Sequence, residues 1–133
     1  MSQENVELLR NGVNAWNQRD VDLWLAHAAP DVEWIPAGPA AVERTIYRGF
    51  DEVRGGITAI WDTWDVFECH ESQVRDLGDS TLWFGHVSMR GRTSGVELDQ
   101  EFAIHSVVRD SKFVLVHTFL SWHEGREAVG LEG

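Results

Sequence analysis

Apolar residues in the first part of the chain recur with the period of an α-helix. Val6, Leu9, Val13 and Trp16 fall at i, i+3, i+7 and i+10, which places them on one helical face. Polar and charged residues occupy the positions between them. The pattern predicts an amphipathic helix that ends near Gln18 and buries this face.

Two further helices and a short strand are predicted before residue 65. Asp20 is a suitable N-cap for the second helix, and Pro30 is expected to end it. Asp31–Ile35 has the alternation of a short strand and is followed by a predicted loop over Pro36–Gly49. The third helix is predicted from the continuous apolar face between Phe50 and Trp64.

The second half of the chain has the composition and alternation of strands. Four β-rich runs are separated by short polar turns: Val66–Leu77, Thr81–Arg92, Gly95–Arg109 and Lys112–Trp122. Such turns predict consecutive hairpins and therefore an antiparallel meander. Helices followed by strands are typical of the α+β class. We expect one α+β domain over residues 1–133, with a short helix in the tail, 123–133.

The last predicted strand is largely apolar on both faces. Val114 and Val116 lie on one face, and Leu115 and Phe119 lie on the other. An antiparallel sheet usually keeps one face polar when that face meets water. If the helices cover the inner face, a second copy of the chain is the simplest cover for the outer one. We predict a homodimer through the outer sheet face; the alternative is that the tail covers it.

The net charge of the chain argues against two classes of binding partner. The chain has 22 acidic and 11 basic side chains, a formal net charge of -11. This charge disfavours nucleic acid and anionic membrane surfaces, which are usually bound through basic patches. Cys69 is the only cysteine, which excludes an internal disulfide scaffold and a cysteine-based zinc site. With a polar, acidic stretch over residues 1–5, we expect a cytoplasmic protein without a signal peptide.

Several segments together resemble a known superfamily. They are Arg19–Trp24 running into Ala29–Trp34, then Tyr47–Arg54, then Arg109–Val114, and finally Glu127–Leu131. In order and spacing they resemble the SnoaL-like and ketosteroid-isomerase-like branch of the nuclear-transport-factor-2-like superfamily. The resemblance implies a cone-shaped α+β barrel. In that fold a curved antiparallel sheet wraps around three N-terminal helices and leaves a pocket open at one end.

The resemblance does not carry one activity with it, because the superfamily hosts isomerases, cyclases, dehydratases, epoxide hydrolases and carriers. The ketosteroid isomerases of this superfamily use a general base, an oxyanion donor and an acidic partner of that donor. The resemblance implies that these three groups would stand at Ile35, before Pro36, at Gly12 and near Ile104 of this sequence. All three positions are apolar or lack a side chain here. A base and an oxyanion site are both needed for that reaction, so we do not predict ketosteroid isomerase activity.

Aromatic residues on the predicted strands point to a pocket for a small hydrophobic molecule. Trp34 and Trp83 come from strands expected to face the helices, and aromatic walls suit a flat apolar ligand. The alternative is that bulky side chains simply fill the cone. The residues predicted to bind the ligand are Trp34, Tyr47, Trp61, Trp83, Met89, Ile104 and Thr118.

Two residues are candidates for proton transfer. Tyr47 is expected near the pocket mouth, where it either donates to a ligand carbonyl or only packs at the third helix. His86 points into the cone if its strand contains a bulge, and outwards if the alternation is regular. Arg90 with Asp99 or Glu101 has the arginine–carboxylate combination of epoxide hydrolases, or forms a cross-strand salt bridge.

The sequence therefore predicts a protein that binds a small molecule in a pocket, and it leaves two alternative functions open. One is a cofactor-independent enzyme of polyketide-cyclase or isomerase type acting on a small hydrophobic carbonyl compound. The other is a non-catalytic binder of small hydrophobic ligands, or an accessory dimerisation domain. No cofactor is expected, and no metal either, because Glu68 and His70 on one strand face have no third ligand nearby in sequence.

Overall fold

The fold was obtained as a computed structural model, which describes residues 2–37 and 46–131. Its elements, in chain order, are α1 (Ser2–Asn17), α2 (Val21–Ala26), β1 (Ala28–Ile35), β2 (Tyr47–Arg48), α3 (Gly49–Thr63), β3 (Trp64–Asp76), β4 (Ser80–Gly91), β5 (Glu97–Arg109), β6 (Lys112–Phe119) and α4 (Trp122–Ala128). Helices precede the long strands, which confirms the predicted α+β class. No helix in these residues is long and apolar enough to cross a membrane.

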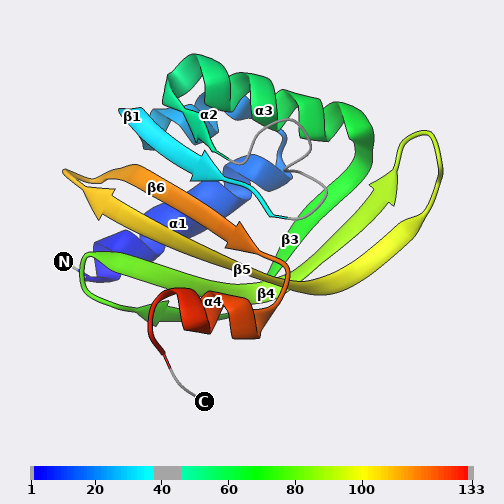
Figure 1. The fold of residues 1–133 in the computed structure, drawn as a ribbon. Coiled ribbons are helices and arrows are strands. Elements are labelled where there is room, and N and C mark those ends of the chain that lie inside the picture. The colour runs from blue at the N-terminus through cyan, green and yellow to red at the C-terminus, as the bar shows by residue number, and fades with distance from the viewer. Residues whose placement is uncertain (1, 38–45, 132–133) are drawn as a thin grey trace.

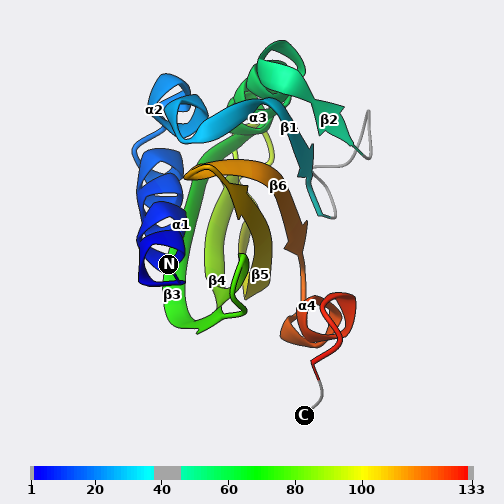
Figure 2. The ribbon, with the colours of Figure 1, turned by 90° about the vertical axis from the view of Figure 1, so that its left-hand side faces the viewer.

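The strands form one curved, open sheet in the order β2-β1-β6-β5-β4-β3 (Figure 1). β3 to β6 pair as the predicted antiparallel meander, whereas β1 joins the sheet by pairing parallel with β6. Figure 2 shows the sheet curving past α1, with α4 on the opposite side of the sheet. The concave side therefore holds the N-terminal helices, and the convex side carries the C-terminal one.

The region around β1 differs from the prediction. α2 ends at Ala26 and β1 already begins at Ala28, so Pro30 lies inside the strand and does not end the helix. Proline has no N–H to donate to a neighbouring strand. Pro30 is tolerated because the register of β1 against β6 shifts between Ala28 and Glu33, so no regular inter-strand hydrogen bond is lost there.

A strand that the sequence did not predict lies in the expected loop over 36–49. β2 is only two residues long and pairs Tyr47 with Trp34 and Arg48 with Glu33. The Arg48 guanidinium reinforces the pairing through a 2.8 Å contact with the Glu33 carboxylate. Most of the rest of that predicted loop, residues 38–45, lies outside the described residues.

Side chains of α1 attach the helix to β3, the last strand of the sheet. The Trp16 indole N–H donates to the Phe67 carbonyl at 3.1 Å. The Arg10 guanidinium makes a two-point contact with the Glu71 carboxylate, with the shorter N···O distance at 2.9 Å. Since β3 has β4 on one side only, these contacts place α1 along its open edge.

Apolar side chains are buried on both sides of the sheet. The larger core lies on the concave side, and a smaller cluster of Leu82, Phe84 and Ala103 lies on the convex side under α4. Gly125 lets α4 approach closely, since a Cβ there would lie 2.8 Å from the Cβ of Ala103. The Trp122 indole N–H also donates to the Gly85 carbonyl at 2.9 Å. The tail thus covers part of the outer face, as the second of the two alternatives predicts.

Candidate functional site

A pocket lies between α1 and the concave face of the sheet, with contributions from α2, α3 and the end of β1. On α1 its wall is the stripe Leu9, Gly12, Val13 and Trp16, the same face that the helical period predicts. Side chains fill most of the interior, and a cavity of about 70 Å³ remains. A dry cavity of roughly 150 Å³ suffices for benzene, so this one suits part of a small molecule.

Aromatic rings form the rigid part of the wall. Trp16 is central, with its ring centroid 6.3 Å from Trp34 and 5.1 Å from Phe67. Trp24 and Phe113 form a second pair, 6.1 Å apart. Because the Trp16 N–H is also bonded to a strand carbonyl, this part of the wall is held in place before any ligand arrives.

Few polar side chains interrupt this apolar lining. Apart from tryptophan N–H groups they are Cys69, Gln100 and Thr118. Burial raises the pKa of the Cys69 thiol to about 12, so the thiol is uncharged at neutral pH. The Thr118 hydroxyl donates to the Ile35 carbonyl at 3.4 Å, while the Gln100 amide has no partner among the described residues. Within the described chain, no carboxylate, imidazole, phenol or cationic side chain lines the pocket.

Four residues predicted to bind the ligand line this pocket: Trp34, Met89, Ile104 and Thr118. Tyr47 and Trp61 instead pack behind the wall, with ring centroids 5.3 Å from Trp34 and 5.2 Å from Trp16 respectively. Trp83 is fully buried in the core next to Ile104 on the neighbouring strand and is not part of the lining.

The two proton-transfer candidates lie away from the pocket. Tyr47 is 8% exposed and packs on the Trp34 ring. His86 alternates with Gly85 and Val87, which leaves its ring on the convex face, 5.3 Å from the Trp122 ring. Neither side chain is among those that line the cavity.

Two positions at which the resemblance implies polar groups in the isomerases do line the pocket. They are Gly12 on α1 and Ile104 on β5, and neither carries a polar side chain. Pro36, which follows the third position, Ile35, lines it as well. The pocket therefore occupies the expected place in the cone but presents apolar surface there.

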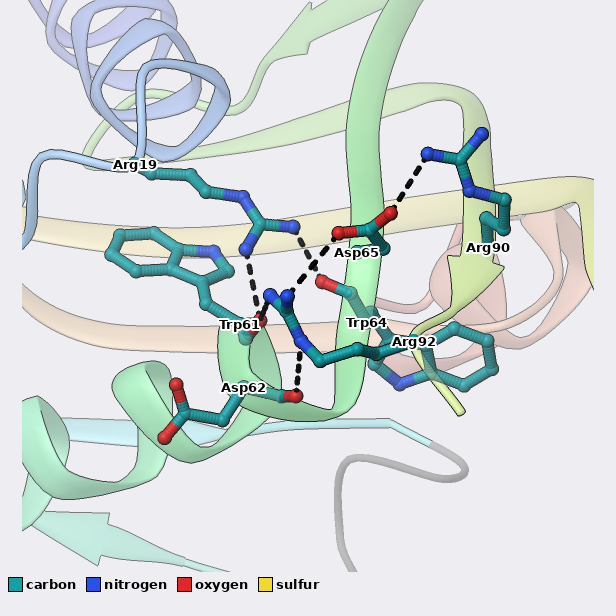
Figure 3. A network of polar contacts seen from close by, with 7 residues as sticks. All are labelled: Arg19, Trp61, Asp62, Trp64, Asp65, Arg90 and Arg92. Carbon is teal, nitrogen blue, oxygen red and sulfur yellow. Dashed lines mark hydrogen bonds and ion pairs between the residues drawn. The ribbon is translucent and has the colours of Figure 1, made fainter. Parts of the chain in front are cut away.

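Arg90 binds a different carboxylate from the two considered in the sequence. Its guanidinium donates to Asp65 at the start of β3 at 2.8 Å (Figure 3). Among the described residues, it forms no hydrogen bond or ion pair with Asp99 or Glu101. The hydrogen bond from Arg90 and the charges of Arg90 and Arg92 lower the pKa of the Asp65 carboxyl. The side chains of Arg90 and Asp65 are both solvent-exposed and lie outside the pocket between α1 and the sheet, so they form a surface ion pair.

The other arginines of this network bind the C-terminal end of α3. Arg19 donates to the carbonyls of Trp61 and Trp64, and Arg92 donates to those of Asp62 and Trp61 (Figure 3). Cations are favourable there because the last carbonyls of a helix lack intrahelical partners. The network therefore ties the turn after α1 and the end of β4 to α3 and has a structural role.

Three lining residues of β5 were not predicted: Leu98, Gln100 and Phe102. They alternate with Ile104, which was predicted, so the period of two along residues 97–109 was the available signal. No three His, Cys, Asp or Glu side chains in residues 2–37 and 46–131 converge as a metal site.

Solved structures with this fold support the overall shape. An NTF2-like protein of unknown function from Burkholderia pseudomallei aligns with a TM-score of 0.80 at 18% identity, covering 93% of this chain and 95% of that one. A candidate polyketide cyclase from Xanthomonas campestris pv. campestris aligns at 0.78 and 19% identity, covering 92% and 94%. A hypothetical protein with a ketosteroid-isomerase-like fold from Catenulispora acidiphila, in complex with trimethylamine, aligns at 0.76 and 12% identity, covering 95% and 94%.

These similarities define the class as a cone-shaped α+β fold of the nuclear-transport-factor-2-like type. The model of the SnoaL-like domain matches residues 9–116, which is more than half of the sequence. The chain belongs to the SnoaL-like family. None of the curated proteins compared with it matches.

Proposed function

We propose that the protein binds a small, uncharged and largely apolar molecule in the pocket between α1 and the sheet. The observation that carries this proposal is the lining itself, which combines fixed aromatic rings with very few polar groups. Burying a charged ligand without a partner costs far more than burying a neutral one.

Of the two alternative functions, we favour non-catalytic ligand binding over a cyclase or isomerase activity. The cyclase or isomerase version needs an acid or base within hydrogen-bond reach of the ligand. In the described lining, the titratable side chain is Cys69, whose raised pKa makes it a poor base and a poor nucleophile at neutral pH. Tyr47 and His86 are not part of that lining.

The seven tryptophans allow a direct test by NMR of ¹⁵N-labelled protein. Trp16, Trp24 and Trp34 line the pocket, whereas Trp122 packs on the convex face and serves as an internal control. Titration with cyclopentanol should move the indole N–H signals of the three lining residues and leave that of Trp122 in place. Cyclopentylammonium and cyclopentanecarboxylate share the ring, add a charge, and should bind more weakly. A ligand of this size should bind with a Kd on the order of 1 mM.

Matched variants separate the pocket from the rest of the core. Val13 lines the pocket and Val74 does not, although both are half-buried against the same core. Val13→Phe should abolish the cyclopentanol shifts, and Val74→Phe should retain them. If no lining signal moves for any of the three probes up to their solubility, or if the charged probes bind best, the proposal is wrong. Acceleration by the protein of the exchange of the α-protons of cyclopentanone with D₂O would show that the enzyme version is correct.

Association of two copies through the outer sheet face stays a prediction. α4 covers Leu82 and Phe84 there, and β5 and β6 still present His105, Leu115 and His117 beside it as half-buried residues. Sedimentation at micromolar concentration should give twice the chain mass of 15.1 kDa, and a monomeric mass would exclude the dimer. The cytoplasmic location is likewise still a prediction.

A further inference from the structure

Alternate residues of β5 line the pocket from its mouth into the core: Leu98, Gln100, Phe102 and Ile104. Leu98 is 38% exposed and lines the pocket, so the pocket reaches the surface beside it. Phe102 and Ile104, further along the same face, are only 6% and 7% exposed. Gln100 lies between them and Leu98 and is partly buried. Gln100 is thus positioned where the solvent-accessible mouth meets the apolar interior.

Gln100 differs from the other polar residues of the lining in what its side chain can still bind. The amide has a carbonyl acceptor and two N–H donors, and none of them has a partner among the described residues. Thr118 already donates its hydroxyl proton to Ile35. The tryptophan N–H groups are donors only. In the described lining, Gln100 alone offers both a free amide donor and a free carbonyl acceptor.

We propose that Gln100 determines ligand specificity by hydrogen-bonding one neutral polar group, a hydroxyl or a carbonyl, at the mouth end of the ligand. The proposal rests on the binding function proposed above and narrows its ligand class. The ligand is then a small ring or branched chain with one polar group, oriented with its apolar end towards Trp16 and Phe102. An amide can bond either group but cannot neutralise a carboxylate, which would remain an unpaired charge in an acidic protein.

The test compares two probes of nearly equal shape in two variants. Cyclopentanol and methylcyclopentane differ by a hydroxyl in place of a methyl group. Gln100→Leu removes the amide and keeps similar bulk. Gln73→Leu makes the same change at an exposed position on β3 outside the lining and is the control. Affinity is measured from the shifts of the Trp16, Trp24 and Trp34 indole signals.

Wild type and Gln73→Leu should show the same ratio of cyclopentanol to methylcyclopentane affinity. In Gln100→Leu, cyclopentanol should bind about three- to ten-fold more weakly, as expected for one lost hydrogen bond, while methylcyclopentane should bind as well or better. If both probes move the lining signals but Gln100→Leu leaves the ratio unchanged, the role of Gln100 is overturned and the binding function stands. That role is also overturned if Thr118→Val changes the ratio and Gln100→Leu does not. If neither probe moves a lining signal in wild type, the binding function itself fails, and the proposal for Gln100 with it.

Discussion

The side-chain amide of Asn17 holds the backbone of Cys69 through two hydrogen bonds. Its Nδ2 donates to the Cys69 carbonyl at 3.0 Å, and its Oδ1 accepts from the Cys69 N–H at 2.8 Å. The last residue of α1 thereby makes the pair of bonds that a neighbouring strand would make with β3. Because Cys69 lines the pocket, this contact also fixes one part of the wall.

Removing this amide should destabilise the fold. Asn17→Ala leaves both backbone groups of Cys69 without their partner in a partly buried place, and we expect a loss of about 1–3 kcal/mol in the free energy of unfolding. Urea denaturation followed by tryptophan fluorescence measures it. Asn14→Ala, at an exposed position on the same helix with no side-chain hydrogen bond in the described structure, should change stability by less than about 0.5 kcal/mol. Equal effects of the two variants would contradict the role of Asn17.

The adjacent glycines of α3 should respond in opposite directions to alanine. Gly55 is exposed, and a Cβ added there would meet no atom within 4 Å, so Gly55→Ala should stabilise the helix by about 0.5–1 kcal/mol. A Cβ at Gly56 would lie 2.8 Å from the Tyr47 ring and 2.9 Å from Trp34. Gly56→Ala should therefore destabilise by about 1–3 kcal/mol through overpacking, despite the better helix propensity of alanine. Thermal unfolding of the two variants measures this, and stabilisation by both would show that the rings can move aside.

Two paired histidines should make the fold less stable in mild acid. His105 and His117 face each other across β5 and β6, and burial lowers the pKa of both below the ordinary 6.5. The charge of Asp79 partly opposes this shift at His105. The unfolded chain then takes up protons more readily than the folded one, so stability is full above about pH 6.5 and falls as the pH decreases below it.

Urea denaturation at pH 7.5 and pH 5.5 measures the effect. The double variant His105→Gln/His117→Gln should lose less stability between these two pH values than the wild type does. His123→Gln removes an exposed imidazole from α4 and is the control. An unchanged pH dependence in the double variant would show that other groups, such as the partly buried His27, cause the loss.

The Cys69 thiol should be almost inert in the folded protein. Its pKa is raised from 9.0 to about 12 by burial, which lowers the thiolate fraction at pH 8 by about a thousand-fold. Iodoacetamide should therefore label Cys69 at least that much more slowly in the native protein than in urea, as measured by mass spectrometry. Rapid labelling of native protein would mean that the pocket wall opens often around this residue.

Most of the fold follows from local patterns, because the dominant signals are periodic. The stripe from Val6 to Trp16 predicted α1 within a residue of its end, and the polar turns predicted the β3–β6 meander. The errors lie where tertiary contacts override local preference. Pro30 sits in β1 because the strand slips against β6 there, and Tyr47–Arg48 forms a strand because β1 offers it an edge. Neither effect is visible in a sequence window.

The site was less predictable than the fold. Which aromatic residues belong to the core and which line the cavity depends on a space of only about 70 Å³. Trp34 lines it and Trp83 does not, although both come from inward-facing strand positions. Gln100 was predictable in principle, since it shares the period of Ile104. Its importance became visible only when the lining proved to hold so few polar groups.

The position of α1 also bears on how this chain behaves at high concentration. The two outermost strands of the described sheet are β3, bordered by a helix, and β2, which has two residues. Side chains of α1 already bond the Phe67 carbonyl and both backbone groups of Cys69 on β3, and open rows of peptide groups are the templates on which strands from separate chains join. We expect concentrated solutions to form reversible complexes in preference to fibres.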